Sequence, residues 1–144
     1  LPYFHVLSNN RDLTFSPRLY STNKILAQSE YRAVNATSKH TIDLSMLSEK
    51  DNSSQSHFFL NSQKKLNSKY FDNLDLSTDL QFTSNDTYLK TYKLDSPLIN
   101  SDTGTLTSTI KFSASNPIGI NEFEKCSQSI IISELSVKII LSNE

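Results

Sequence analysis

The chain has 144 residues, of which 36% are hydrophobic and 20% charged, and this length suits one domain with a single sizeable core. The 14 basic and 15 acidic residues nearly cancel to a net charge of −1, whereas a nucleic-acid binder usually carries a basic excess. No run reaches the roughly 20 apolar residues of a membrane-spanning helix. Two glycines also argue against a glycine-rich phosphate loop.

Alternation of apolar and polar residues recurs along the chain and predicts strands with one apolar and one polar face. The first such run holds Leu13, Phe15 and Leu19 on one parity, and later runs cover residues 25–34, 41–46, 57–63, 72–83 and 105–112. The adjacent aromatic residues Phe58 and Phe59 leave the facing of the fourth run open. Polar turn-forming segments separate the runs. We therefore expect an all-β antiparallel meander.

Two architectures remain open from this pattern. A soluble antiparallel sandwich also has strands with one buried and one solvated face. The runs are about 8–11 residues long, more than the usual 5–6, and this length suits a tilted strand that crosses a bilayer. Charged residues in the middle of strands suit a face that lines water, and aromatic residues near strand ends are typical of an interfacial girdle.

The parity of each run assigns candidate residues to the two faces of such a barrel. The polar side chains expected to face a water-filled lumen are Glu30, Arg32, Asp43, Asp75 and Asp79. The apolar side chains expected to face lipid are Leu74, Leu76, Leu80, Phe82, Leu106, Ile110 and Phe112.

Catalytic and metal-binding patterns are weak. His5, His40 and His57 lie far apart, without the spacing of a zinc motif, and the single cysteine, Cys126, can form neither an internal disulfide nor a zinc site alone. Asp75 and Asp79 lie about 13 Å apart on one strand, too far for a pair of glycosidase carboxylates. We therefore predict no enzymatic activity, no metal and no cofactor.

Several short motifs occur in the order and spacing of a known family. They are the segments Leu1–Phe4, Asn10–Arg18, Glu30–Arg32 and Leu80–Leu89. They resemble the "LPYY/LPYF", "N-x-D-x-T-x-x-P-R", "E-[FY]-R" and "S-[ND]-x-[ST]-Y-[LF]" stretches of the lipopolysaccharide-assembly outer-membrane protein (LptD) family. No single motif is specific, but their colinear order extends over residues 1–115.

The resemblance implies a role in the outer membrane of a Gram-negative bacterium. Members of the family form a large β-barrel that inserts lipopolysaccharide into the outer leaflet, together with a plug lipoprotein (LptE-like) and a periplasmic bridge protein. This chain would supply part of that barrel, without the periplasmic domain or the closing strands. It also implies that Pro2 lies on a strand beside the lateral gate, where a proline weakens strand pairing.

The domain organisation that follows is a region of barrel strands at 1–115 and a divergent tail at 116–144. In the tail, short apolar blocks replace the alternation, so it could add one more strand or remain disordered. The alternative function is a soluble β-sandwich or adhesin-like binding module that uses its polar loops.

Overall fold

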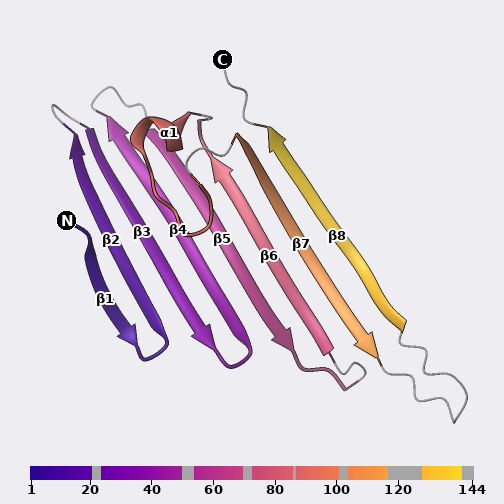
Figure 1. Ribbon diagram of the computed structural model, residues 1–144. Helices are drawn as coiled ribbons and strands as arrows, with labels where there is room; N and C mark the ends of the chain where they lie inside the picture. The colour runs from indigo at the N-terminus through magenta and orange to yellow at the C-terminus, as the bar shows by residue number, and fades with distance from the viewer. Residues whose placement is uncertain are drawn as a thin grey trace, which may run out of the picture.

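The computed structural model describes residues 1–20, 24–49, 54–69, 73–85, 87–100, 104–116 and 128–140. Within these ranges eight strands pair in sequence order, β1 to β8, in one antiparallel sheet that does not close on itself (Figure 1). The strands are β1 (Tyr3–Ser8), β2 (Arg11–Tyr20), β3 (Lys24–Asn35), β4 (Ser38–Glu49), β5 (Ser54–Leu66), β6 (Asn73–Thr83), β7 (Thr105–Asn116) and β8 (Gln128–Ile140). The predicted all-β antiparallel meander is confirmed. The helix α1 (Tyr88–Tyr92) follows β6 and lies over β3–β5 in Figure 1.

The register places the apolar parity of every central strand on the same side of the sheet. Residues directly opposite each other share a face, and one such row runs through Leu13, Tyr31, Ile42, Leu60 and Leu80. We call this side the apolar face. It is largely uncovered, since many of its large side chains are exposed, among them Leu19, Ile25, Leu44, Met46, Phe58, Phe82 and Ile110. A sandwich would pack this face against a second sheet, and in the described part of the chain all strands belong to one sheet.

The buried core lies on the opposite side, which we call the polar face. The alternation predicts that any burial would be on the apolar face. The buried cluster instead consists of Leu26, Leu47 and Phe59 together with residues of α1 and the segment after it. Leu26 and Leu47 face each other across β3 and β4 and share the parity of Gln28 and Asp43. At one end of the sheet these two leucines take positions that polar residues hold elsewhere on this face. They provide an apolar surface on which α1 packs.

Leu106 departs from the expected outward position. Its side chain is 1% exposed and belongs to the buried cluster, while Ile110 on the same strand is 40% exposed. The described ladder between β6 and β7 ends at Asp79 opposite Thr109. Beyond it, Gln81 binds β7 through its side chain, because the amide N–H of Thr107 donates to Gln81 Oε1 at 3.0 Å. The facing was predicted from alternation within one run, and β7 leaves its regular ladder with β6 before it reaches Leu106.

The prolines near the first strands lie where a missing N–H donor is tolerated. Pro2 precedes β1, which begins at Tyr3. Pro17 lies on β2 opposite Ala27, and the register continues through it without a shift. Because β1 pairs with β2 only as far as Phe15, the rest of β2 has no strand on that side within the described residues. Edge positions of this kind accept proline.

Two segments extend the predicted set of elements. Residues 128–140 form β8, which pairs with β7 over its length with one register shift between Phe112 and Ser113. Cys126 lies outside the described residues. Within the stretch 80–89, the strand β6 ends at Thr83, and Tyr88 and Leu89 begin the helix α1. Among the helices of the described residues, none has the length and hydropathy to cross a membrane.

Phe58 and Phe59 provide a direct test of which face holds the core. Phe59 is 0% exposed and Phe58 is 38% exposed on the opposite face. We expect Phe59→Ala to lower the free energy of unfolding by about 3 kcal/mol or more. The adjacent Phe58→Ala should cost less than half as much. Denaturant unfolding followed by circular dichroism measures both, and equal costs would contradict this assignment of the faces.

Candidate functional site: a buried polar network beneath a strap

The segment of residues 87–100, which we call the strap, covers part of the polar face. It begins in a turn in which Asn85 Oδ1 accepts bonds from the amide and hydroxyl of Thr87, and it continues as the single helical turn of α1. Lys93 then adopts a left-handed conformation, with φ 46°, that ends the helix. Tyr88, Leu89 and Leu94 are buried against the sheet. Their burial is the main apolar contribution to strap docking.

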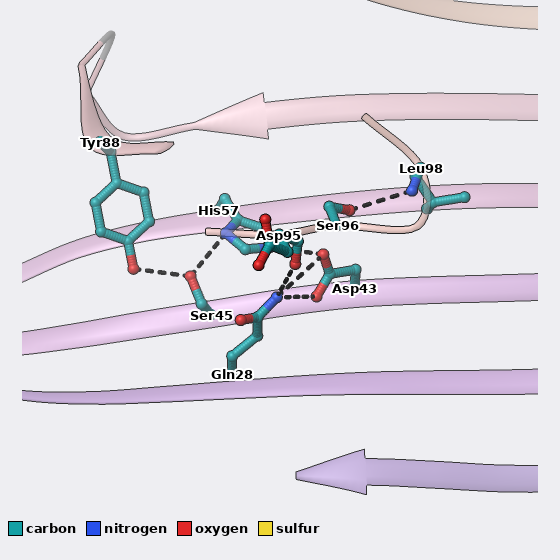
Figure 2. A network of polar contacts seen from close by, with 8 residues as sticks. All are labelled: Gln28, Asp43, Ser45, His57, Tyr88, Asp95, Ser96 and Leu98. Atoms are coloured by element: carbon teal, nitrogen blue, oxygen red, sulfur yellow. Dashed lines mark hydrogen bonds and ion pairs between the residues drawn. The ribbon is translucent and has the colours of Figure 1, made fainter. Parts of the chain in front are cut away.

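A chain of polar side chains lies between the strap and the sheet (Figure 2). The Ser45 hydroxyl lies 2.7 Å from His57 Nδ1 and 2.7 Å from the Tyr88 hydroxyl. Gln28 Nε2 donates to Asp43 Oδ1 at 3.2 Å and to the backbone oxygen of Asp95 at 2.8 Å. Strands β3, β4 and β5 each contribute to the network, and the register places Gln28, Ser45 and His57 side by side.

The side chains of this network are buried away from bulk solvent. Gln28 is 7% exposed, Ser45 and His57 are 2% exposed, and Asp43 is fully buried. His57 Nε2 lies 3.3 Å from Asp43 Oδ2, an ion-pair distance when the ring is protonated. The geometry is not that of a hydrogen bond, so Nε2 has no hydrogen-bond partner among the described residues. A buried polar atom in this state costs free energy and calls for an explanation.

The strap is also held through its backbone carbonyl groups. Arg18 Nη1 donates to the carbonyl oxygens of Tyr92 at 3.5 Å and Lys93 at 3.2 Å, and the Tyr20 hydroxyl donates to that of Tyr92 at 3.3 Å. The Tyr92 hydroxyl in turn donates to Glu49 at 3.1 Å. The sheet therefore binds the strap by its peptide groups and its two tyrosines.

The order Asp43–His57–Ser45 has the composition of a nucleophilic triad, but its surroundings favour a structural role. Acyl transfer needs a substrate beside the serine oxygen and donors for the developing oxyanion. With the strap in place, Ser45 is 2% exposed and its hydroxyl contacts His57 and Tyr88. In this state the arrangement can hold and orient the strap, and the serine cannot reach a substrate.

All five charged residues predicted to face water lie on the polar face, in different surroundings. Asp43 belongs to the buried network, and Glu30 lies directly opposite it on β3. Arg32 Nε binds Asp12 at 2.8 Å and lies 3.5 Å from Glu30. Both carboxylate oxygens of Asp79 accept from Asn61 at 3.1 Å. Asp75 is exposed near the β5–β6 connection and takes no part in the network.

Sequence reasoning missed Gln28, Ser45, His57 and Tyr88 as partners. One signal was present, because Asp43 and Ser45 share a parity on one strand. The link to His57 and Gln28 requires the cross-strand register, and the link to Tyr88 requires the fold-back of the strap. Neither is encoded in local alternation.

A second hollow, of about 460 Å³, lies near the turn between β3 and β4, and Lys39, Lys64 and Lys65 are among the residues that line it. Lys64 and Lys65 are exposed at the end of β5. Asp75 lines the same hollow, so the local charge is mixed.

Comparison with known proteins adds no identification. No protein-family model matches the chain, and neither a curated protein nor a solved structure matches it.

Removing the central hydroxyl should weaken strap docking. Ser45→Ala leaves His57 Nδ1 and the Tyr88 hydroxyl without their partner, and we expect a loss of about 1–3 kcal/mol in unfolding free energy. Ser48→Ala, on the same strand but exposed on the apolar face, is the matched control and should change stability by less than about 0.5 kcal/mol. Similar losses for both variants would show that the network does not stabilise the fold.

Burial raises the pKa of the Tyr88 phenol, although its bond with Ser45 acts in the opposite direction. A phenol with a raised pKa in the folded state contributes stability below its ordinary pKa of about 10 and loses it as the pH rises further. Wild-type protein should therefore lose stability relative to Tyr88→Phe above that pH and not below it. Denaturant unfolding of both proteins at several pH values tests this, and a constant difference would contradict it.

Proposed function

We propose that this chain is a strand segment of an outer-membrane lipopolysaccharide translocon of a Gram-negative bacterium. One observation carries the proposal: one sheet has a largely uncovered apolar face opposite a polar face. Hydrocarbon is a favourable environment for the apolar face, and a hydrated passage is a favourable environment for the polar face. The resemblance of residues 1–115 to the LptD family supports the same assignment.

Strand lengths agree with this environment. Strands β2 to β7 have 10 to 13 residues. Tilted transmembrane strands need about 9–11 residues. Longer strands carry the sheet beyond the hydrocarbon region into the headgroup layer.

The two edges of the sheet require further strands. Within the described residues, β1 pairs only with β2, and β8 only with β7. An open edge in lipid leaves backbone groups without partners. In the proposed parent barrel, additional strands complete the ring, and Pro2, which precedes β1, lies beside the seam between β1 and the next strand.

The proposed cargo matches both faces. Acyl chains of lipopolysaccharide suit the apolar face, and its sugars suit a passage lined by hydroxyl, amide and carboxylate groups. A plug lipoprotein and a periplasmic bridge protein are the partners proposed for the parent. Glu30, Arg32, Asp75 and Asp79 would line the passage, whereas Asp43 lies buried beneath the strap.

A pair of substitutions on β6 tests the membrane assignment. We expect Leu80→Arg, on the apolar face, to destabilise the vesicle-bound chain by about 2–4 kcal/mol, because it places a charge in hydrocarbon. Ser77→Arg, on the polar face, should cost about 1 kcal/mol or less. Binding to phosphatidylcholine vesicles, measured by flotation across a urea series, reports both.

The soluble alternative gives a different result. A β-sandwich or adhesin-like module would remain monomeric in buffer and would not float with vesicles. The effects of Leu80→Arg and Ser77→Arg on its stability would be the same with and without lipid. That outcome would overturn the translocon proposal.

A further inference from the structure

We infer that the polar network beneath the strap is a carbohydrate-binding surface, and that the strap occupies it as an internal competitor. This inference rests on the proposed function and extends it, because it assigns the sugar part of the cargo to particular residues. The sheet side of the surface consists of Gln28, Asp43, Ser45 and His57.

The chemistry of these four side chains suits hydroxyl groups. An amide, a carboxylate, a hydroxyl and an imidazole can each donate to or accept from a sugar hydroxyl. They lie on three neighbouring strands, in the register that places Gln28 beside Ser45 and Ser45 beside His57. Tyr20, on the adjacent strand β2, adds an aromatic ring whose centroid lies 5.5 Å from that of Tyr92 in the strap.

The strap contacts this surface with the groups that a sugar would use. The Tyr88 hydroxyl lies 2.7 Å from Ser45 Oγ, and the Asp95 carbonyl oxygen accepts from Gln28 Nε2 at 2.8 Å. A sugar hydroxyl can both donate and accept a hydrogen bond, so it can replace either the Tyr88 hydroxyl or the Asp95 carbonyl oxygen. The strap thereby gives Ser45 and Gln28 a further hydrogen-bond partner each, in addition to His57 and Asp43 on the sheet.

His57 is the one member of the surface that the strap leaves incomplete. Its Nε2 atom is fully buried and has no hydrogen-bond partner among the described residues, although Asp43 Oδ2 lies 3.3 Å away. Buried polar atoms are nearly always satisfied in native proteins. Once the strap has left, a ligand hydroxyl that approaches these two atoms from the side of the strap would bind both.

Strap and sugar cannot use Ser45 and Gln28 at the same time, so binding requires the strap to leave the sheet. A ligand that binds only the open state shifts the population toward that state. This predicts that a saccharide opens the strap, whereas a ligand that bound the closed state would protect it.

The first experiment measures affinity with the full chain in detergent micelles. The probe is core oligosaccharide released from lipopolysaccharide by mild acid, and the method is isothermal titration calorimetry. Tyr88→Phe removes one strap anchor and keeps the ring, so the affinity should rise about fivefold, the equivalent of one ordinary hydrogen bond. Thr91→Ala, at an exposed strap position, is the control and should change nothing.

A second substitution separates the sheet from the strap. In the Tyr88→Phe background, the strap has already lost its bond with Ser45, so adding Ser45→Ala removes no further bond to the strap, only the contacts of this hydroxyl with His57 and with the sugar. We expect the oligosaccharide affinity of this double variant to fall about fivefold below that of Tyr88→Phe.

Limited trypsin digestion measures strap opening. Lys90 and Lys93 lie on the strap and are exposed, but cleavage beside them needs local unfolding. The oligosaccharide should accelerate cleavage at these two sites severalfold and leave cleavage at Lys64 and Lys65 in β5 unchanged.

Protection of Lys90 and Lys93 by the oligosaccharide, an unchanged affinity in Tyr88→Phe, or no binding to either protein would overturn the inference. Each of these outcomes is compatible with normal flotation on vesicles and a normal response to Leu80→Arg. Failure of the inference is thus distinguishable from failure of the proposed membrane role.

Discussion

The antiparallel register is the constraint on which the other features depend. A shift of one residue in a ladder would move every side chain of a strand to the opposite face. On β4, such a shift would exchange Asp43 and Ser45 with Leu44 and Met46, which would end both the buried network and the uniform apolar face. The register is continuous from β2 to β6, and shifts occur only near the end of β1 and between Phe112 and Ser113. The strands beneath the strap therefore pair without a register shift.

Strap docking combines two interactions that depend on each other. Leu26, Leu47 and Phe59 exclude water from one end of the polar face once Leu89 and Leu94 pack on them. In this dry environment a satisfied hydrogen bond is strong and an unsatisfied polar group is costly. The contacts of Tyr88 and Asp95 thus contribute more than similar contacts would on an open surface, and they also fix where along the sheet the strap can lie.

Polar turn-forming segments between the runs predicted the antiparallel order. Local alternation predicted the strands β2 to β7 and, for every run but the fourth, their two faces, because these follow from parity within one run. It was insufficient for the strap. The sequence of α1 is a single turn, too short to show helical periodicity, and Leu26 and Leu47 look like interruptions of a polar parity until the register makes them neighbours. His57 stood beside two aromatic residues of undecided facing, so its pairing with Ser45 could not be inferred. The membrane assignment remains a proposal that rests on the exposed apolar face and the family resemblance.

The charge distribution of the polar face explains why the strap covers only one part of it. The covered part holds one carboxylate, Asp43, surrounded by the neutral amide of Gln28 and the ring of His57. Next along β3 come Glu30 and Arg32, and at these partly exposed positions Arg32 forms ion pairs with Asp12 and with Glu30. Burying these groups under a longer strap would cost several kcal/mol per charge, whereas leaving them in water costs little. The same sheet thus carries a buried polar surface beneath the strap and a charged surface that stays hydrated.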